Sequence, residues 1–102
     1  MPNSLVTNLY PAPTPGATDQ TLDVGDSVET FGAFNSLTKF IVLDVQVADV
    51  RVTYDGSTPS STNGHILFAG RSYTWSKAAA AAAKFIEDTT TDATIHASEF
   101  TV

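Results

Sequence analysis

The sequence predicts an all-β protein, either an antiparallel β-sandwich with a jelly-roll-like arrangement or a small barrel, carrying one short Ala-rich helical turn. Three observations indicate this fold class. Segments with strand character recur roughly every eight to twelve residues between turn signals, as in all-β domains. Charged residues make up only 16% of the chain, and the abundance of Thr, Ser and Val favours strands over helices. Residues 37–46 are apolar on both faces in the middle, as a central strand requires.

Residues 1–18 are predicted to form an extended Pro-rich arm, and residues 19–102 a single β domain. The run 11–16 cannot be helical and lacks donors for a sheet ladder, so we expect it to be extended and mostly solvated. Residues 4–10 have the pattern of a short strand. The arm is either a free terminus or a segment that orders on a neighbouring subunit. The apolar side chains available for such a contact are Leu5, Leu9 and Tyr10.

The next segments predict two hairpins. Residues 20–24 and 27–31 are short strands with the turn pair Gly25-Asp26 between them. The strongest strand, 37–46, has apolar odd positions, whereas the even positions are apolar after residue 49. One strand spanning both patterns would exceed the usual length, so we expect a tight turn at 47–49 that makes a hairpin. A bulge is the alternative, because one extra residue also changes the phase.

Residues 50–76 read as a strand, a polar loop, a return strand, a tight turn and an aromatic strand. Asp55-Gly56 ends the first strand, and residues 58–64 consist of turn-forming residues. Extended structure resumes at 65–68 and closes at Ala69-Gly70. These turns are explicit but carry no catalytic motif, so we interpret the Asp55-Gly56 loop as scaffold.

The C-terminal third begins with the longest alanine run. Six consecutive alanines within residues 77–84 predict a short helix over an open end of the sheet, with Ser76 as its N-cap. Phe85-Ile86 should anchor the exit of this helix. A turn at 89–92 then leads into a final strand, 93–102. The inward residues of that strand are expected to be Ile95, Ala97 and Phe100.

Composition and charge exclude several classes of function. The net charge is −6, which argues against binding to nucleic acid or to an anionic membrane surface. The chain has no Cys and therefore no disulfide, thiolate metal site or Cys nucleophile. No apolar run approaches the roughly 20 residues of a membrane span, and no secretory signal is visible.

The polar residues do not form a recognisable catalytic or metal-binding pattern. His65 and His96 belong to no metal-ligand spacing, so structural roles are expected. Asp44, Asp49 and Asp55 suggest a calcium or acid–base cluster, but all three flank predicted turns, where carboxylates commonly cap the backbone. We therefore expect a non-enzymatic protein without catalytic residues, metal or cofactor.

An aromatic turn is the best candidate for a partner interface. Phe68, Tyr73 and Trp75 flank the predicted exposed turn that contains Arg71. Aromatic residues and Arg are enriched at the centres of protein interfaces. The predicted interface therefore consists of this group together with the three apolar residues of the arm.

A resemblance to a known family covers about residues 42–97. The matching segments are Val50-Arg51-Val52-Thr53-Tyr54-Asp55-Gly56, Thr58-Pro59-Ser60, Asn63-Gly64-His65-Ile66-Leu67, Ala69-Gly70, Ala82-Ala83-Lys84-Phe85-Ile86 and Ala93-Thr94-Ile95-His96-Ala97. This pattern resembles small all-β structural proteins of tailed bacteriophages. The shared residues are strand and turn positions, and the Pro-rich start and the alanine run lie outside the pattern.

The resemblance implies a virion structural protein, and most specifically a capsid decoration (cement) protein. Its partner would be the major capsid protein, on the exterior of the capsid. The chain would be made in the host cytoplasm and would bind as a homo-oligomer, with a trimer favoured. The alternative is a phage tail or fibre component, or a carbohydrate- or receptor-binding module that reads glycans through Tyr73 and Trp75.

Overall fold

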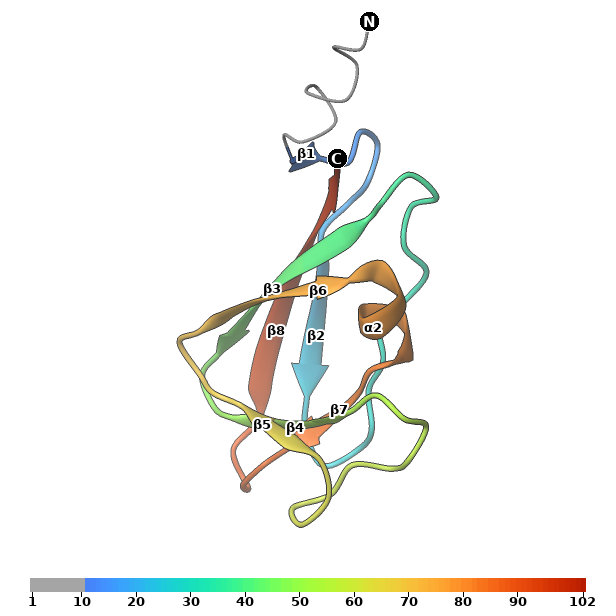
Figure 1. The fold of residues 1–102 in the computed structure, drawn as a ribbon. Coiled ribbons are helices and arrows are strands. Elements are labelled where there is room, and N and C mark those ends of the chain that lie inside the picture. The colour runs from blue at the N-terminus through green and yellow to red at the C-terminus, as the bar shows by residue number, and fades with distance from the viewer. Residues whose placement is uncertain (1–10) are drawn as a thin grey trace, which may run out of the picture.

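Two antiparallel β-sheets and one short helix enclose a common core in the computed structural model, which describes residues 11–102 (Figure 1). The larger sheet contains β1 (Ala12–Pro13), β2 (Gln20–Val24), β3 (Phe40–Gln46), β6 (Ser72–Ser76) and β8 (Ala93–Thr101). The smaller sheet contains β4 (Val50–Thr53), β5 (His65–Leu67) and β7 (Lys84–Glu87), and helix α2 spans Lys77–Ala82. The predicted all-β, sandwich-like fold with one Ala-rich helical turn is confirmed.

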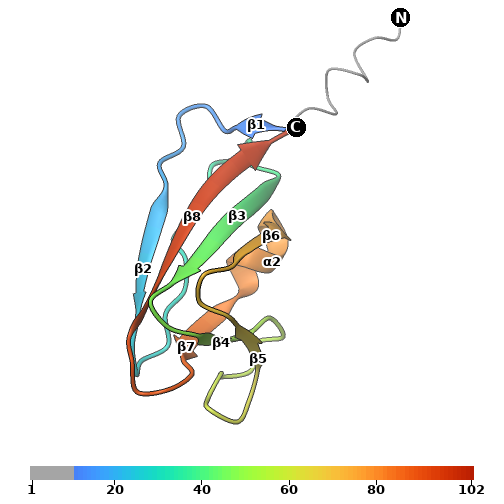
Figure 2. The ribbon, with the colours of Figure 1, turned by 90° about the vertical axis from the view of Figure 1, so that its left-hand side faces the viewer.

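Strand β8 organises the larger sheet, in which it has neighbours on both sides. One edge pairs with β3 from Phe40↔Phe100 to Gln46↔Thr94. The other edge pairs with β2 over Ala93 to Ala97 and with β1 near its end. Because β3 also pairs with β6, it has a neighbour on each side, and the prediction that this strand is central is confirmed. Figure 2 shows β2, β8 and β3 on one side of the molecule and β4, β5 and β7 on the other.

The inward residues of β8 are predicted correctly except at its end. Ile95 and Ala97 are buried, and the alternation then places Glu99 on the same inner face. Phe100 therefore points to the other face, where its ring stacks on that of Phe40 at a centroid distance of 5.4 Å. The prediction that Phe100 lies inward is wrong, because the strand keeps its period of two through to its last residues.

The proline run departs from the prediction, because part of it joins the sheet. Ala12 and Pro13 pair with the end of β8, and the Thr14 amide donates a hydrogen bond to the Glu99 carbonyl at 3.0 Å. A proline is tolerated here because β1 is an edge strand, with no partner on its outer side among residues 11–102. The predicted strand 4–10, with Leu5, Leu9 and Tyr10, lies outside the described residues.

A buried polar cluster fixes the chain just after β1. Glu99 is buried, and its Oε1 accepts hydrogen bonds of 2.7 Å from the Asn35 amide and from the Thr38 hydroxyl. The Thr38 hydroxyl also lies 3.0 Å from that of Thr14. A buried carboxylate is tolerated only when it is hydrogen-bonded, so these contacts are required for Glu99 to be buried. They join three segments: the chain just after β1, the β2–β3 connection and β8.

The predicted hairpin at Gly25-Asp26 is wrong. Residues 27–31 form no strand, and only Glu29 makes an isolated bridge, to Phe85 of β7. The connection is shaped instead by Phe31, whose ring packs edge-on against Phe85 at a centroid distance of 5.3 Å. Burial of this ring outweighs the local alternation pattern, which alone favoured a strand.

The predicted hairpin at 47–49 is also wrong, although the turn itself is present. Strand β3 lies in the larger sheet, whereas β4 pairs with β5 and β7 in the smaller one. The turn is therefore a corner between the two sheets. The phase change in the alternation arises because odd residues of β3 and even residues of β4 both face the same core.

The core is centred on Phe85, which has no exposed surface. The Trp75 ring stacks parallel to the Phe85 ring at a centroid distance of 6.1 Å, and Phe31 contacts it from the β2–β3 connection. Helix α2 closes this side with Ala80 buried, and the Ser76 hydroxyl caps the helix by accepting from the Ala79 amide. The predicted N-cap and the anchoring role of Phe85 are confirmed.

Replacing Phe85 with Ala should destabilise the protein by about 3–5 kcal/mol, because the deletion removes the ring that three parts of the chain contact. Chemical denaturation of the purified chain measures this. Phe68→Ala is the matched control, since the same atoms are lost at a half-exposed position, and it should cost less than about 1 kcal/mol. Equal losses in the two variants would contradict this description of the core.

Candidate functional site: the corner surface

Of the four predicted interface residues in the aromatic turn, two side chains are exposed and two are half-buried. Phe68 is 48% exposed and follows β5, and Arg71 is exposed just before β6. The guanidinium carbon of Arg71 lies 5.5 Å from the Phe68 ring centroid, a cation–π distance. Tyr73 and Trp75 are half-buried on the inner face of β6, where they pack against the core.

Of the two inward aromatic residues, Tyr73 supports the exposed pair and Trp75 belongs to the core. The Phe68 amide donates a hydrogen bond of 2.9 Å to the Tyr73 hydroxyl, which fixes the backbone that carries the exposed ring. Trp75 lies between Phe85 and Tyr54, with the Tyr54 ring edge-on at 5.0 Å. Tyr73 therefore positions Phe68, whereas Trp75 packs in the core. The half-buried rings of these two residues do not form a flat exposed platform.

The turn that carries Phe68 and Arg71 is joined to the corner between the sheets. The Gly70 amide donates to the Val45 carbonyl at 2.7 Å, and the Val45 amide donates to the Arg71 carbonyl at 3.0 Å. The Ala69 amide also donates to Asp49 Oδ1 at 2.8 Å. These bonds hold residues 68–71 beside residues 45–49 as one rigid unit.

Val47 projects from this unit and was not identified from the sequence as a functional residue. It is 74% exposed, the highest value among the large hydrophobic residues of the described chain. The available signal was its position at the phase change, where a β-branched residue is unexpected in a turn. We call Val47, Phe68 and Arg71 the corner surface.

The backbone at Val47 is strained. Its φ of 77° lies in the left-handed region, which β-branched residues rarely adopt. The Ala48 amide donates to the Gln46 carbonyl at 3.0 Å across this residue, which makes a γ-turn. Such a conformation costs on the order of 1–3 kcal/mol. An exposed apolar residue kept in a strained position brings no evident gain in folding, and such exceptions concentrate at functional sites.

The corner surface offers chemistry suited to binding a protein. A guanidinium over an aromatic ring provides apolar area together with donors for carboxylates and carbonyl oxygens. Val47 adds apolar area on a backbone that is already fixed. Preorganised anchors lose little conformational entropy when a partner binds, so they contribute more to affinity than mobile side chains do.

The three aspartates considered as a metal cluster make separate local contacts. Asp44 accepts from the Ser72 hydroxyl, Asp49 from the Ala69 amide, and Asp55 from the amide and hydroxyl of Ser57. Within residues 11–102, no three side chains of His, Cys, Asp or Glu gather in an arrangement that could hold a metal ion.

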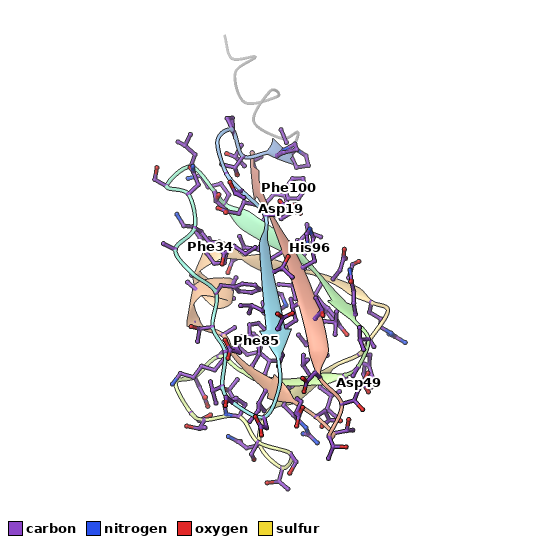
Figure 3. All side chains as sticks on the ribbon, turned by 180° about the vertical axis from the view of Figure 1, so that it is seen from behind. Asp19, Phe34, Asp49, Phe85, His96 and Phe100 are labelled. Carbon is purple, nitrogen blue, oxygen red and sulfur yellow. The ribbon has the colours of Figure 1, made fainter. Side chains whose placement is uncertain are left out.

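The two histidines lie on different sheets. His96 of β8 contacts Asp19 through Nε2 at 3.2 Å and the Thr21 hydroxyl through Nδ1 at 3.1 Å, on the face shown in Figure 3. His65 begins β5 and is exposed, with its ring centroid 6.3 Å from that of Tyr54. Asp49, labelled in the same figure, lies apart from the His96 pair.

One carboxyl group outside the corner surface is electrostatically unfavourable. Burial raises the pKa of Glu87 above its ordinary value of 4.5, and the neighbouring carboxylates of Asp92 and Asp26 raise it further. Within the described chain, Glu87 Oε2 is a buried oxygen without a hydrogen-bond partner. Compared with the unfolded chain, the folded protein therefore binds the proton of this group more tightly.

Comparison with protein-family models, with curated proteins and with solved structures finds no match for this chain. The resemblance to bacteriophage structural proteins therefore stays a sequence-based expectation. In the part of the chain that the structure describes, no helix is long and apolar enough to cross a membrane.

Replacing Val47 with Gly should stabilise the isolated protein by about 1 kcal/mol, because the relief of strain exceeds the entropy that glycine adds to the unfolded chain. Thermal denaturation measures the change. Val47→Ala is the control, since it removes the isopropyl group but keeps a Cβ at the same positive φ, and it should gain less. A stability loss in Val47→Gly would show that the corner is not strained.

Replacing Glu87 with Gln should stabilise the protein at neutral pH. Because the folded-state pKa is raised, native stability falls as pH rises from about 4.5 through the folded-state value. The Glu87→Gln variant loses this dependence, so its advantage should vanish below pH 4.5. Melting temperature measured across this pH range tests the prediction, with Asp23→Asn, an exposed carboxylate on β2, as the control for net charge. The same pH profile in wild type and Glu87→Gln would refute it.

Proposed function

We propose that this chain is a non-enzymatic structural protein that binds a larger protein assembly through the corner surface. In its most specific form, the proposal is a decoration protein of a tailed-bacteriophage capsid. It binds the major capsid protein on the exterior of the virion, as a homo-oligomer for which a trimer is favoured. Its action is the burial of surface between neighbouring capsid subunits, without a cofactor.

The observation that carries this proposal is the exposed Phe68 ring with the Arg71 guanidinium over it. Backbone hydrogen bonds hold their turn against the corner that bears the strained, exposed Val47. Interfaces depend on a few such anchors, in which aromatic residues and Arg predominate. The corner is held by backbone hydrogen bonds on both sides, so these anchors keep their positions before binding.

The place where the chain enters the sheet supports a bridging role. Strand β1 lies at the opposite end of the larger sheet from the corner between β3 and β4 (Figure 1). Glu99, Thr38 and Thr14 fix the chain just after β1, so this end of the sheet offers a defined position for a second contact. Contacts at the β1 end of the sheet and contacts at the corner surface would therefore reach different capsid subunits.

The alternative, a tail or fibre component or a glycan-reading module, has less support at the predicted residues. Tyr73 and Trp75 pack inward, so neither ring presents an open face of the kind on which a sugar stacks. A protein interface at Phe68 and Arg71 uses side chains that the structure exposes.

Binding to expanded, empty capsids tests the proposal. The capsids are assembled from the major capsid protein of the phage to which the proposal assigns this chain, and co-sedimentation measures stoichiometry and affinity. Wild type should bind stoichiometrically, and the double variant Phe68→Ala/Arg71→Ala should bind at least about 30-fold more weakly, as loss of two interface anchors predicts.

The matched control is Leu37→Ala, which removes an apolar side chain of 57% exposure from the distant β2–β3 connection. This variant should bind like the wild type. The proposal fails if the wild-type chain does not bind, or if Leu37→Ala weakens binding as much as the double variant does.

A further inference from the structure

The β4–β5 loop, residues 54–64, is unusually well ordered for a surface loop rich in Gly, Ser and Thr. The Thr53 hydroxyl donates to the Ser57 carbonyl at 2.7 Å, and Asn63 Nδ2 donates to the Thr58 carbonyl at 2.8 Å. Ser60 and Asn63 exchange two backbone hydrogen bonds. A compact loop packed by its own side chains is frequently functional.

The end of this loop is fixed equally firmly. Arg51 donates from Nη1 to the Gly64 carbonyl at 3.0 Å and from Nε to Asp88 at 2.6 Å. Gly64 has a φ of 115°, and a Cβ at this position would lie 2.7 Å from the Val52 carbonyl oxygen. Only glycine allows the loop to return this close to β4.

The loop forms an open pocket of about 290 Å³ with β4 and the start of β5. This volume is at the lower end of the range for ligand pockets, roughly 300–1,000 Å³, so it fits a single small ring. Tyr54 and His65, whose ring centroids lie 6.3 Å apart, line the pocket together with the polar residues Asp55, Ser57 and Asn63. It therefore combines aromatic surface with a few convergent polar groups.

The aromatic side of the pocket is rigid and open. Tyr54 is 37% exposed, and its ring contacts Trp75, which in turn stacks on the fully buried Phe85. Burial, with a smaller contribution from Tyr73, raises the pKa of Tyr54, so its hydroxyl stays protonated and can donate a hydrogen bond. A fixed, partly exposed ring is a suitable surface for the C–H face of a cyclic ligand.

The polar side of the pocket presents acceptors. Within the described chain, Asp55 accepts both of its hydrogen bonds, from the Ser57 amide and hydroxyl, through Oδ1, which leaves Oδ2 available. Asn63 donates from Nδ2 within the loop and its backbone carbonyl accepts from the Ser60 amide, which leaves its side-chain Oδ1 available. Two such oxygens match a ligand that offers neighbouring hydroxyl donors.

The local charge favours a neutral ligand. The hydrogen bonds from Ser57 and the positive charge of Lys84 lower the pKa of Asp55, so this acceptor is ionised at neutral pH. Lys84 Nζ also donates to the carbonyl of the adjacent Gly56 at 3.2 Å, which offsets the carboxylate. The Asp55 carboxylate would repel an anion, and the nearby charge of Lys84 weakens the attraction of that carboxylate for a cation.

We propose that the pocket formed by Tyr54, Asp55, Asn63 and His65 binds one ring of a neutral glycan. The ring lies against Tyr54, and two of its hydroxyl groups donate to Asp55 and Asn63. This site lies on the β4–β5 loop, which the sequence pattern suggested was scaffold, and not on Tyr73 and Trp75. The proposal goes beyond binding to a capsid and does not rest on it.

Titration of the isotope-labelled full chain, followed by amide NMR, tests the site. The probes are methyl β-D-glucopyranoside, methyl β-D-galactopyranoside and N-acetyl-D-glucosamine, together with a glycan array read with the labelled chain. At least one pyranose should produce saturable shifts confined to the amides of residues 54–65. Tyr54→Ala should weaken this binding about tenfold, and Tyr54→Phe, which keeps the ring, by much less.

Controls separate ring stacking from other causes. Sorbitol, an acyclic polyol, and methylguanidinium, a cation, should leave these amides unshifted, and Phe68→Ala should bind the sugar normally. Asp55→Asn, which keeps the side-chain shape, provides a second variant if Tyr54→Ala does not fold, and it should bind severalfold more weakly. The proposal is overturned if the array and all three sugars give no binding, if either control ligand shifts the same amides equally, or if the folded variants bind like the wild type.

Discussion

The contact of Phe85 with Trp75 and Phe31 is the interaction on which the rest of the structure depends. Phe85 belongs to the smaller sheet, Trp75 to the larger sheet and Phe31 to the connection between β2 and β3. One buried ring therefore joins the two sheets and orders a connection that has no strand of its own. In a chain of 102 residues the available core is small, so a single aromatic centre contributes a large share of the buried apolar area.

A rigid core allows unfavourable local features to persist at the periphery. The positive φ of Val47 is sustained because β3 and β4 are each anchored in a sheet and leave only a short corner between them. The same core holds Tyr54 in place through Trp75, at the edge of the β4–β5 loop. The corner surface and the loop pocket are thus two separate exposed regions supported by one aromatic cluster.

Elements with strong local patterns were predictable from the sequence: the central strand with its alternating Ile41, Leu43 and Val45, the Ser76 cap with the alanine helix, and the final strand. Pairing partners were not, because a tight turn between two strands is compatible with a hairpin or with a corner between sheets. The bridge from Glu29 to Phe85 depends on a contact between residues far apart in the chain. For the candidate site, the exposed turn bearing Phe68 and Arg71 was visible as a pattern. The inward orientation of Tyr73 and Trp75 and the exposure of Val47 depend on how the sheets pack.

Hydrogen–deuterium exchange of the full chain, free and bound to expanded capsids, tests most directly whether the corner surface is the site of partner binding. Exchange should slow on binding at residues 46–49 and 68–71, while the exposed loop 89–92 keeps its free-state rate. The contrary result would be a bound chain whose corner amides exchange as in the free protein while another surface, such as β2 or the β4–β5 loop, becomes protected.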